Sequence, residues 1–168
     1  MAWTTPKTDF APGDILTAAQ VNAIGTNLDA IGGAWTSFTP SWTNLTPGNG
    51  TADAAYIAAG KLYVVRVMFT FGSTSAMGTG PIMTLPNASS LDAGYSVTGW
   101  PLGIANGFDT GTNLYAGQVM YDTATTVRFR FQDVTGTYLV ATTQPSATVP
   151  FTWTTGDRLA FQFVYEAA

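Results

Sequence analysis

The sequence predicts an all-β fold, a β-sandwich or jelly roll of about 8–10 short antiparallel strands preceded by one short N-terminal α-helix. Three observations lead to this prediction. One segment near the N-terminus has apolar residues at helical spacing. From Trp35 onward, apolar and polar residues alternate with a period of two. Gly, Pro, Asn and Asp separate these runs, as the turns of an antiparallel sheet require.

The helix is expected to begin directly after Thr17. Thr17 is a suitable N-cap, and Gln20 three positions later completes a capping box, in which each side chain binds the other residue's backbone N–H. The helix should run to about Ile31, where Gly32 and Gly33 end it.

The apolar residues of this helix form a narrow seam of the coiled-coil type, spaced three, four and three positions apart. They are Val21, Ile24, Leu28 and Ile31. A helix of about 14 residues is only marginally stable alone in water, so the seam needs a partner surface. Either the helix folds back on its own domain or it packs against copies of itself. We predict the second arrangement, a homotrimer whose seams meet at a three-fold axis.

Ten segments are expected to be strands. The three with the clearest alternation are Leu62–Phe71, Val127–Gln132 and Leu159–Glu166. The shorter ones are Ser37–Thr43, Ala54–Ala58, Ile82–Leu85, Tyr95–Trp100, Leu114–Tyr121, Thr137–Thr142 and Phe151–Thr154. The expected turns are Pro47–Gly50, Pro86-Asn87, Asn106-Gly107 and Gly156-Asp157.

Composition excludes several classes of function. The chain has 168 residues with no His and no Cys. Their absence excludes catalysis by imidazole, nucleophilic thiolates and zinc sites built from His or Cys ligands. Six cations against ten anions argue against nucleic acid and against an anionic membrane surface. The N-terminus lacks the pattern of a signal peptide, and Leu62–Phe71 is too short to cross a bilayer as a helix. We therefore expect a protein made in the cytoplasm, without cofactor, metal or membrane insertion.

Carboxylates are scattered rather than paired across a predicted cleft, so we expect no enzyme. They are Asp53, Asp92, Asp109, Asp122, Asp133, Asp157 and Glu166. Most fall in predicted turns, where capping of the turn explains an aspartate. A calcium site around Asp92, Asp109 or Asp122 is the alternative, although no D-x-D-x-D spacing exists.

Aromatic and basic residues allow two interpretations each. Trp35, Phe38 and Trp42 are expected to pack the junction of helix and sheet. The candidates for stacking on a sugar ring are Trp100, Phe108, Tyr115 and Tyr138, and core packing is the alternative. Four arginines lie on predicted strands, where they either face solvent or pair with acids across a subunit interface. They are Arg66, Arg128, Arg130 and Arg158.

Three segments resemble a known family. Residues 12–19 read Pro-Gly-Asp-Ile-Leu-Thr-Ala-Ala, and Asn22 and Asn27-Leu28 follow. Residues 35–46 read Trp-Thr-Ser-Phe-Thr-Pro-Ser-Trp-Thr-Asn-Leu-Thr, and Pro150-Phe151-Thr152-Trp153 lies near the end. These segments, within about residues 3–56 and 148–168, resemble short phage virion proteins of the minor tail or tail-fibre-like kind, common in phages of actinobacteria.

The resemblance implies a non-enzymatic structural protein of the virion that forms homo-oligomers. Residues 1–34 would then be an attachment segment and oligomerisation helix that docks on other virion proteins. Residues 35–168 would be a β-sandwich domain, with a host-surface glycan as its candidate contact. The chain is shorter than many tail fibres, so a capsid decoration or head-fibre protein is the alternative. A stand-alone carbohydrate-binding module is a second alternative, and a glycan-degrading enzyme is the least favoured.

Overall fold

The computed structural model describes residues 11–31, 34–95, 97–133 and 140–168 of the chain. Its elements are α1 (Ala18–Ile31), β1 (Thr36–Ser37), β2 (Trp42–Thr46), β3 (Thr51–Ala59), β4 (Leu62–Thr70), β5 (Ala76–Thr84), η1 (Pro86–Ala88), β6 (Pro101–Asp109), β7 (Asn113–Thr123), β8 (Thr126–Asp133), β9 (Val140–Thr143) and β10 (Arg158–Glu166). The predicted class, all-β with one N-terminal helix, is confirmed.

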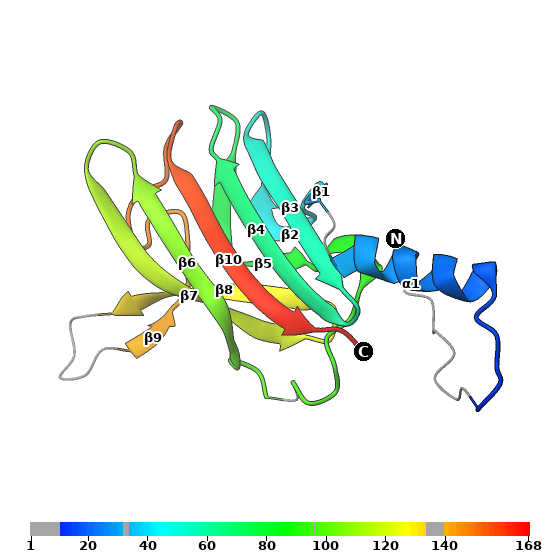
Figure 1. Ribbon diagram of the computed structural model, residues 1–168. Coiled ribbons are helices and arrows are strands. Elements are labelled where there is room, and N and C mark those ends of the chain that lie inside the picture. The colour runs from blue at the N-terminus through cyan, green and yellow to red at the C-terminus, as the bar shows by residue number, and fades with distance from the viewer. Residues whose placement is uncertain (1–10, 32–33, 96, 134–139) are drawn as a thin grey trace.

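The strands belong to one antiparallel sheet rather than to two separate ones. Its hydrogen-bonded order is β1-β3-β4-β10-β6-β7-β8-β5-β2, and β9 pairs with β8 outside this path. The sheet curls strongly, so that β3, β4, β10 and β6 form one layer with β8, β5 and β2 behind it (Figure 1). The two layers of the expected sandwich are therefore two halves of a continuous sheet.

Aromatic contacts between the two layers account for the curl. Trp42 of β2 lies 6.0 Å from Phe69 of β4 and 6.1 Å from Phe161 of β10, measured between ring centroids. Phe161 in turn lies 4.5 Å from Phe129 of β8. These strands are far apart in the hydrogen-bonded order, so the rings meet across the interior. Each such ring buries a large apolar area, and this burial is the main force that closes the sheet on itself.

A short stretch of chain joins the two edges of the curled sheet. The Phe38 N–H donates to the Ala54 carbonyl in β3 at 3.1 Å, whereas the Ser41 carbonyl accepts from the Thr84 N–H in β5 at 3.0 Å. Between them, Pro40 is buried. The predicted strand Ser37–Thr43 is thus split into β1 and β2, one at each edge.

The helix begins as the sequence predicts. The Thr17 N–H donates to Gln20 Oε1 at 2.7 Å, and the Gln20 N–H donates to Thr17 Oγ1 at 3.3 Å. These are the two reciprocal bonds of a capping box. The helix extends away from the β3 side of the sheet (Figure 1). Gly32 and Gly33, expected to end it, lie outside the described residues.

The predicted turn at Asn106-Gly107 is wrong, because both residues lie inside β6. Gly107 is buried, and a Cβ built there would lie 2.9 Å from Phe131 Cζ and 3.2 Å from Phe151 Cε1. Glycine is required here by the close approach of two core rings and not by a change of chain direction. The actual turn follows β6, where the Thr112 N–H donates to the Asp109 carbonyl at 2.9 Å.

Two predicted strands are loops. In Tyr95–Trp100, of which the structure describes all but residue 96, the Trp100 N–H donates locally to the Val97 carbonyl at 3.0 Å. In Phe151–Thr154, the Trp153 N–H donates to the Ala147 carbonyl at 3.2 Å. Tyr95, Phe151 and Trp153 still pack inward, whereas Val97 and Trp100 are 59% and 47% exposed. The predicted strand Thr137–Thr142 overlaps β9, and its first three residues lie outside the described part of the chain.

Candidate functional site

The helix seam is not covered by the part of the chain that the structure describes. The side chains of Val21, Ile24 and Leu28 are 52%, 43% and 62% exposed. The side of the helix that turns toward the protein instead carries Asn27, which is 5% exposed, and the half-buried Ala23. The side chain of Ile31, the fourth predicted seam residue, lies outside what the structure describes.

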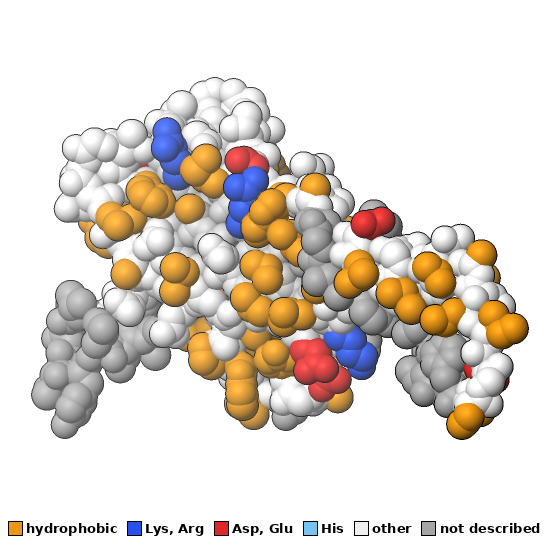
Figure 2. Space-filling view, in the orientation of Figure 1, with side chains coloured by type: hydrophobic (Ala, Val, Ile, Leu, Met, Phe, Trp, Pro, Cys, Tyr) orange, Lys and Arg blue, Asp and Glu red, His pale blue; other side chains and the backbone are white. Residues whose placement is uncertain are grey.

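The exposed seam continues into the segment before the helix. Ile15 and Leu16 are also largely exposed, and hydrophobic side chains line the visible side of the helix (Figure 2). Between Ala18 and Ile31 the sequence has one charged residue, Asp29. Identical helices placed side by side would therefore bring few like charges together.

The four aromatic residues proposed for sugar contact do not form one platform. Trp100 is 47% exposed and meets Tyr95 edge-on, with ring centroids 6.3 Å apart. It precedes β6, whereas Phe108 lies near the other end of that nine-residue strand, roughly 25 Å away at about 3.3 Å per residue. Tyr115 pairs with Gly107, so it points to the opposite side of the sheet from Phe108. Tyr138 lies outside the described residues.

Several of the scattered carboxylates have local structural roles. Asp92 accepts from the Gly94 N–H at 2.8 Å within a turn. Asp157 is 2% exposed and accepts from the N–H groups of Thr110 and Thr154. Over the described ranges, no three acidic side chains come close enough to hold a metal ion. Nor does any helix in those ranges have the length and apolar character to span a membrane.

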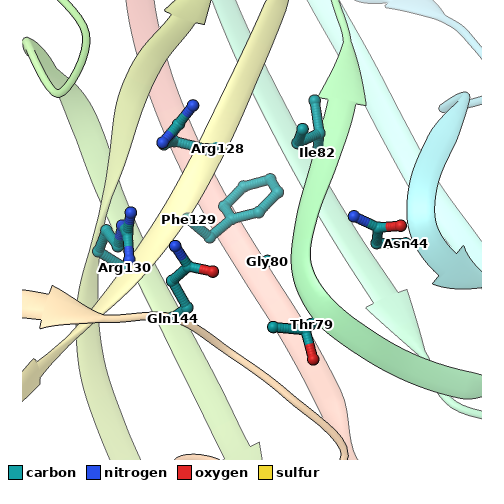
Figure 3. Close-up of a pocket in the computed structure, with 8 residues that line it drawn as sticks. All are labelled: Asn44, Thr79, Gly80, Ile82, Arg128, Phe129, Arg130 and Gln144. Carbon is teal, nitrogen blue, oxygen red and sulfur yellow. The ribbon is translucent and has the colours of Figure 1, made fainter.

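A pocket forms where β5 bulges away from its neighbouring strands, β2 and β8. Thr43 of β2 pairs with Ile82 of β5, and Leu45 of β2 pairs with Met77 of β5. The four β5 residues between these pairs, 78–81, therefore lie opposite a single β2 residue, Asn44. Asn44 has a left-handed φ of 59°, which asparagine tolerates better than most residues. The pairing of β5 with β8 covers only Ile82–Thr84. This bulge opens a cavity of about 180 Å³ between β2, β5 and β8 (Figure 3).

The segment that follows β9 lies against the bulge of β5. The Gly80 N–H donates to the Pro145 carbonyl at 2.9 Å, and Gly80 has a left-handed φ of 60°. A Cβ at Gly80 would lie 2.8 Å from the side chain of Gln144. Glycine at this position therefore lets the Gln144 amide reach the cavity wall.

Two arginines of β8 line this pocket from the same face of the strand. Arg128 forms an ion pair with Asp122 of β7, which also accepts from Thr126 Oγ1 at 2.9 Å. The Arg128 Nε atom is buried and has no hydrogen-bond partner among the residues that the structure describes. The guanidinium is therefore held in place by one carboxylate but not fully satisfied by it.

Arg130 contacts a neutral group in the pocket. The Gln144 side-chain oxygen, in the amide orientation that satisfies both groups, accepts from Nη2 and Nη1 of Arg130 at 2.9 and 3.0 Å. Burial lowers the pKa of Arg130 below its usual value, and repulsion from Arg128 lowers it further. Both arginine side chains line the pocket (Figure 3).

The sequence indicated part of this site. Arg128 and Arg130 alternate with apolar residues, which predicted that they share one face of a strand. Asn44, Gly80 and Gln144 gave no signal, because they reach the pocket only through the bulge in β5 and the curl of the sheet. Of the other arginines on strands, Arg66 lies over the ring of Trp35, 4.9 Å from its centroid.

Comparison of the chain with protein-family models, with curated proteins and with solved structures finds no match. The resemblance to phage minor tail and fibre-like proteins therefore stays a prediction from the sequence.

Proposed function

We propose that this protein is a structural component of a phage virion, of the minor tail or fibre-like kind, and that it acts as a homotrimer joined through α1. The proposal rests on one observation in particular, the exposed apolar seam of Val21, Ile24 and Leu28. Three side chains of this size, each about half exposed, would gain roughly 1 kcal/mol apiece from full burial. Because the described part of the chain leaves these side chains exposed, we expect a partner to cover them.

A second copy is the partner that fits the seam best. With Val21 at position a of a heptad, Ile24 is at d, Leu28 at a and Ile31 at d. Leucine at a with isoleucine at d favours three or four strands over two. The near absence of charge on the helix suits packing against identical copies, and it offers little to a partner that binds through ion pairs.

The remaining parts of the chain suit a passive role. The ten described strands curl around an aromatic core and form a rigid body, which the helix would hold beside its copies. The proposal that the protein is part of a virion rests on the resemblance of residues 3–56 and 148–168 to phage minor tail and fibre-like proteins. The sequence before the helix would dock on other virion proteins, and symmetry would multiply weak contacts of each subunit.

Light scattering on the purified protein tests the trimer. Three chains of 17.7 kDa give about 53 kDa, which is the expected mass at micromolar concentration. Leu28→Asp should yield the monomer of 17.7 kDa, because it places three carboxylates at the three-fold axis. Thr26→Asp is the matched control, since it adds the same charge to an exposed position away from the seam. A monomeric parent protein, or equal loss of trimer in both variants, would contradict the proposal.

Cryo-electron microscopy of purified phage particles tests whether the protein is part of the virion and where it lies. Three-fold density at the tail, joined to it through the helix end, is the expected result. Density distributed over the head would favour the decoration protein instead, and absence of the protein from particles would contradict a virion role.

A further inference from the structure

We infer that a hollow at the turn between β6 and β7 binds an uncharged sugar ring of the hexopyranose kind. This inference goes beyond the structural role proposed above, and it holds whether the protein is trimeric or not. The turn lies beside the start of β10 at one end of the sheet (Figure 1), and Arg158, the first residue of β10, completes the hollow. Its volume of about 420 Å³ lies within the range of small-molecule sites, roughly 300–1,000 Å³.

One part of the hollow is apolar. Gly107 faces the core rings, so the next residue, Phe108, points to the outer face of the sheet. Phe108 pairs with Arg158 of β10 and with Leu114 of β7, so these three side chains stand in one row on that face. Leu114 is 59% exposed, and the Phe108 ring is half-buried outside the core cluster. The negative face of an aromatic ring attracts weakly positive C–H groups, which the faces of a sugar ring carry.

The other part of the hollow is polar and suits hydroxyl groups. It is lined by Asp109, Asn113 and Arg158. Among the residues that the structure describes, these three side chains have no hydrogen bond or ion pair, so their polar atoms are open to a ligand. The carboxylate accepts, the guanidinium donates and the amide does both, which matches hydroxyls that also donate and accept. Because one cation and one carboxylate line the hollow, an uncharged ligand suits it better than an acid or an amine.

The turn that carries these groups is fixed to the body of the protein. The Thr110 N–H donates to Oδ1 of Asp157 at 3.0 Å, and Thr110 Oγ1 donates to the Gly156 carbonyl at 2.7 Å. Asp157 is itself 2% exposed, so this anchor is buried. The Thr112 N–H closes the turn on the Asp109 carbonyl at 2.9 Å. A turn that is ordered before the ligand arrives loses less entropy on binding.

Saturation-transfer NMR on the purified protein tests the inference, with the methyl glycosides of glucose, galactose, mannose and N-acetylglucosamine as probes. We expect saturable binding of at least one of them, with a Kd on the order of 1 mM. Glycerol has hydroxyls but no ring, so it should not saturate. Glucuronate and glucosamine should bind no more tightly than the best uncharged probe. Absence of saturable binding by all four glycosides, equal binding of glycerol, or tighter binding of a charged sugar would overturn the inference.

Two variants locate the binding to the hollow. Phe108→Ala removes the ring, and Asp109→Ala removes the carboxylate acceptor. Each should weaken binding of the best probe at least about ten-fold, and the second tests the hollow even if the first destabilises the fold. Trp35→Ala and Asp53→Ala remove an exposed aromatic ring and an exposed carboxylate outside the hollow, so they are the matched controls and should bind as the parent does. Equal weakening in the controls, or unchanged binding in Asp109→Ala, would overturn the inference.

Discussion

Replacing Asp157 with alanine should destabilise the fold by about 4 kcal/mol. The carboxylate is 2% exposed and joins two loops. Its Oδ1 accepts from the Thr110 N–H at 3.0 Å, and its Oδ2 accepts from the Thr154 N–H at 2.6 Å and from Thr154 Oγ1 at 3.1 Å. Alanine leaves both N–H groups without this acceptor, at roughly 1–3 kcal/mol each. The Thr154 hydroxyl can rotate to another partner, so it adds little.

Urea unfolding followed by the fluorescence of the five tryptophans measures this loss. With a slope near 2 kcal/mol per molar urea, about 4 kcal/mol lowers the midpoint by roughly 2 M. Heating gives a second readout, an expected fall in Tm of about 8–16 °C for a chain of this length. Protein concentration must be held constant, because the stability of an oligomer depends on it.

Two further variants show whether the loss of stability comes from these hydrogen bonds or from a general sensitivity to substitution. Asp53→Ala removes an exposed carboxylate in β3 and should change the stability by less than about 0.5 kcal/mol. Asp157→Asn keeps one acceptor oxygen and should lie between the parent and Asp157→Ala. If Asp157→Ala lowers the stability by less than about 1 kcal/mol, or if Asp53→Ala lowers it as much as Asp157→Ala does, the two backbone hydrogen bonds of Asp157 do not hold the loops together.

Three more predictions follow from single contacts. Gly107→Ala should destabilise the fold by about 1–3 kcal/mol, because the added Cβ would lie 2.9 Å from Phe131 Cζ. Urea unfolding measures this loss, and an unchanged midpoint would contradict it. Gly25→Ala should stabilise the helix by about 1 kcal/mol and raise helical circular dichroism, because nothing beyond the adjacent residues and the helix's own backbone lies within 4 Å of the added Cβ. A loss of helical signal would contradict this. Burial raises the pKa of Tyr165, a shift that its 2.6 Å hydrogen bond with Ser89 only partly offsets. Its stabilising contribution is therefore complete below the ordinary value of about 10 and falls as the pH rises further. Absorbance titration should show a late tyrosine ionisation that Tyr165→Phe removes.

Regular alternation and local capping made part of the fold predictable. The strands β4, β8 and β10 alternate apolar and polar residues along nearly their whole length, and the helix start is specified by Thr17 and Gln20 within four residues. Both signals are local, because each depends on the period of one element or on contacts between near neighbours.

The parts that sequence reasoning missed depend on contacts between distant residues. Gly107 was interpreted as a turn because its role, room for Phe131 and Phe151, is visible only when β6 is placed over them. Most of β5 was missed for a related reason, since Gly78, Gly80 and Pro81 interrupt its alternation at the bulge. The pocket itself joins residues from β2, β5, β8 and the segment after β9, and no spacing along the chain relates them.

The place of β10 in the sheet has a consequence for the order of folding during synthesis. It is the last of the ten described strands to leave the ribosome, yet it lies between β4 and β6 at the centre of the sheet. Until it emerges, both of those strands present open edges, which are prone to pair with other chains. The described sheet therefore cannot close before β10 has emerged, and chaperones would have the most exposed surface to bind during that interval.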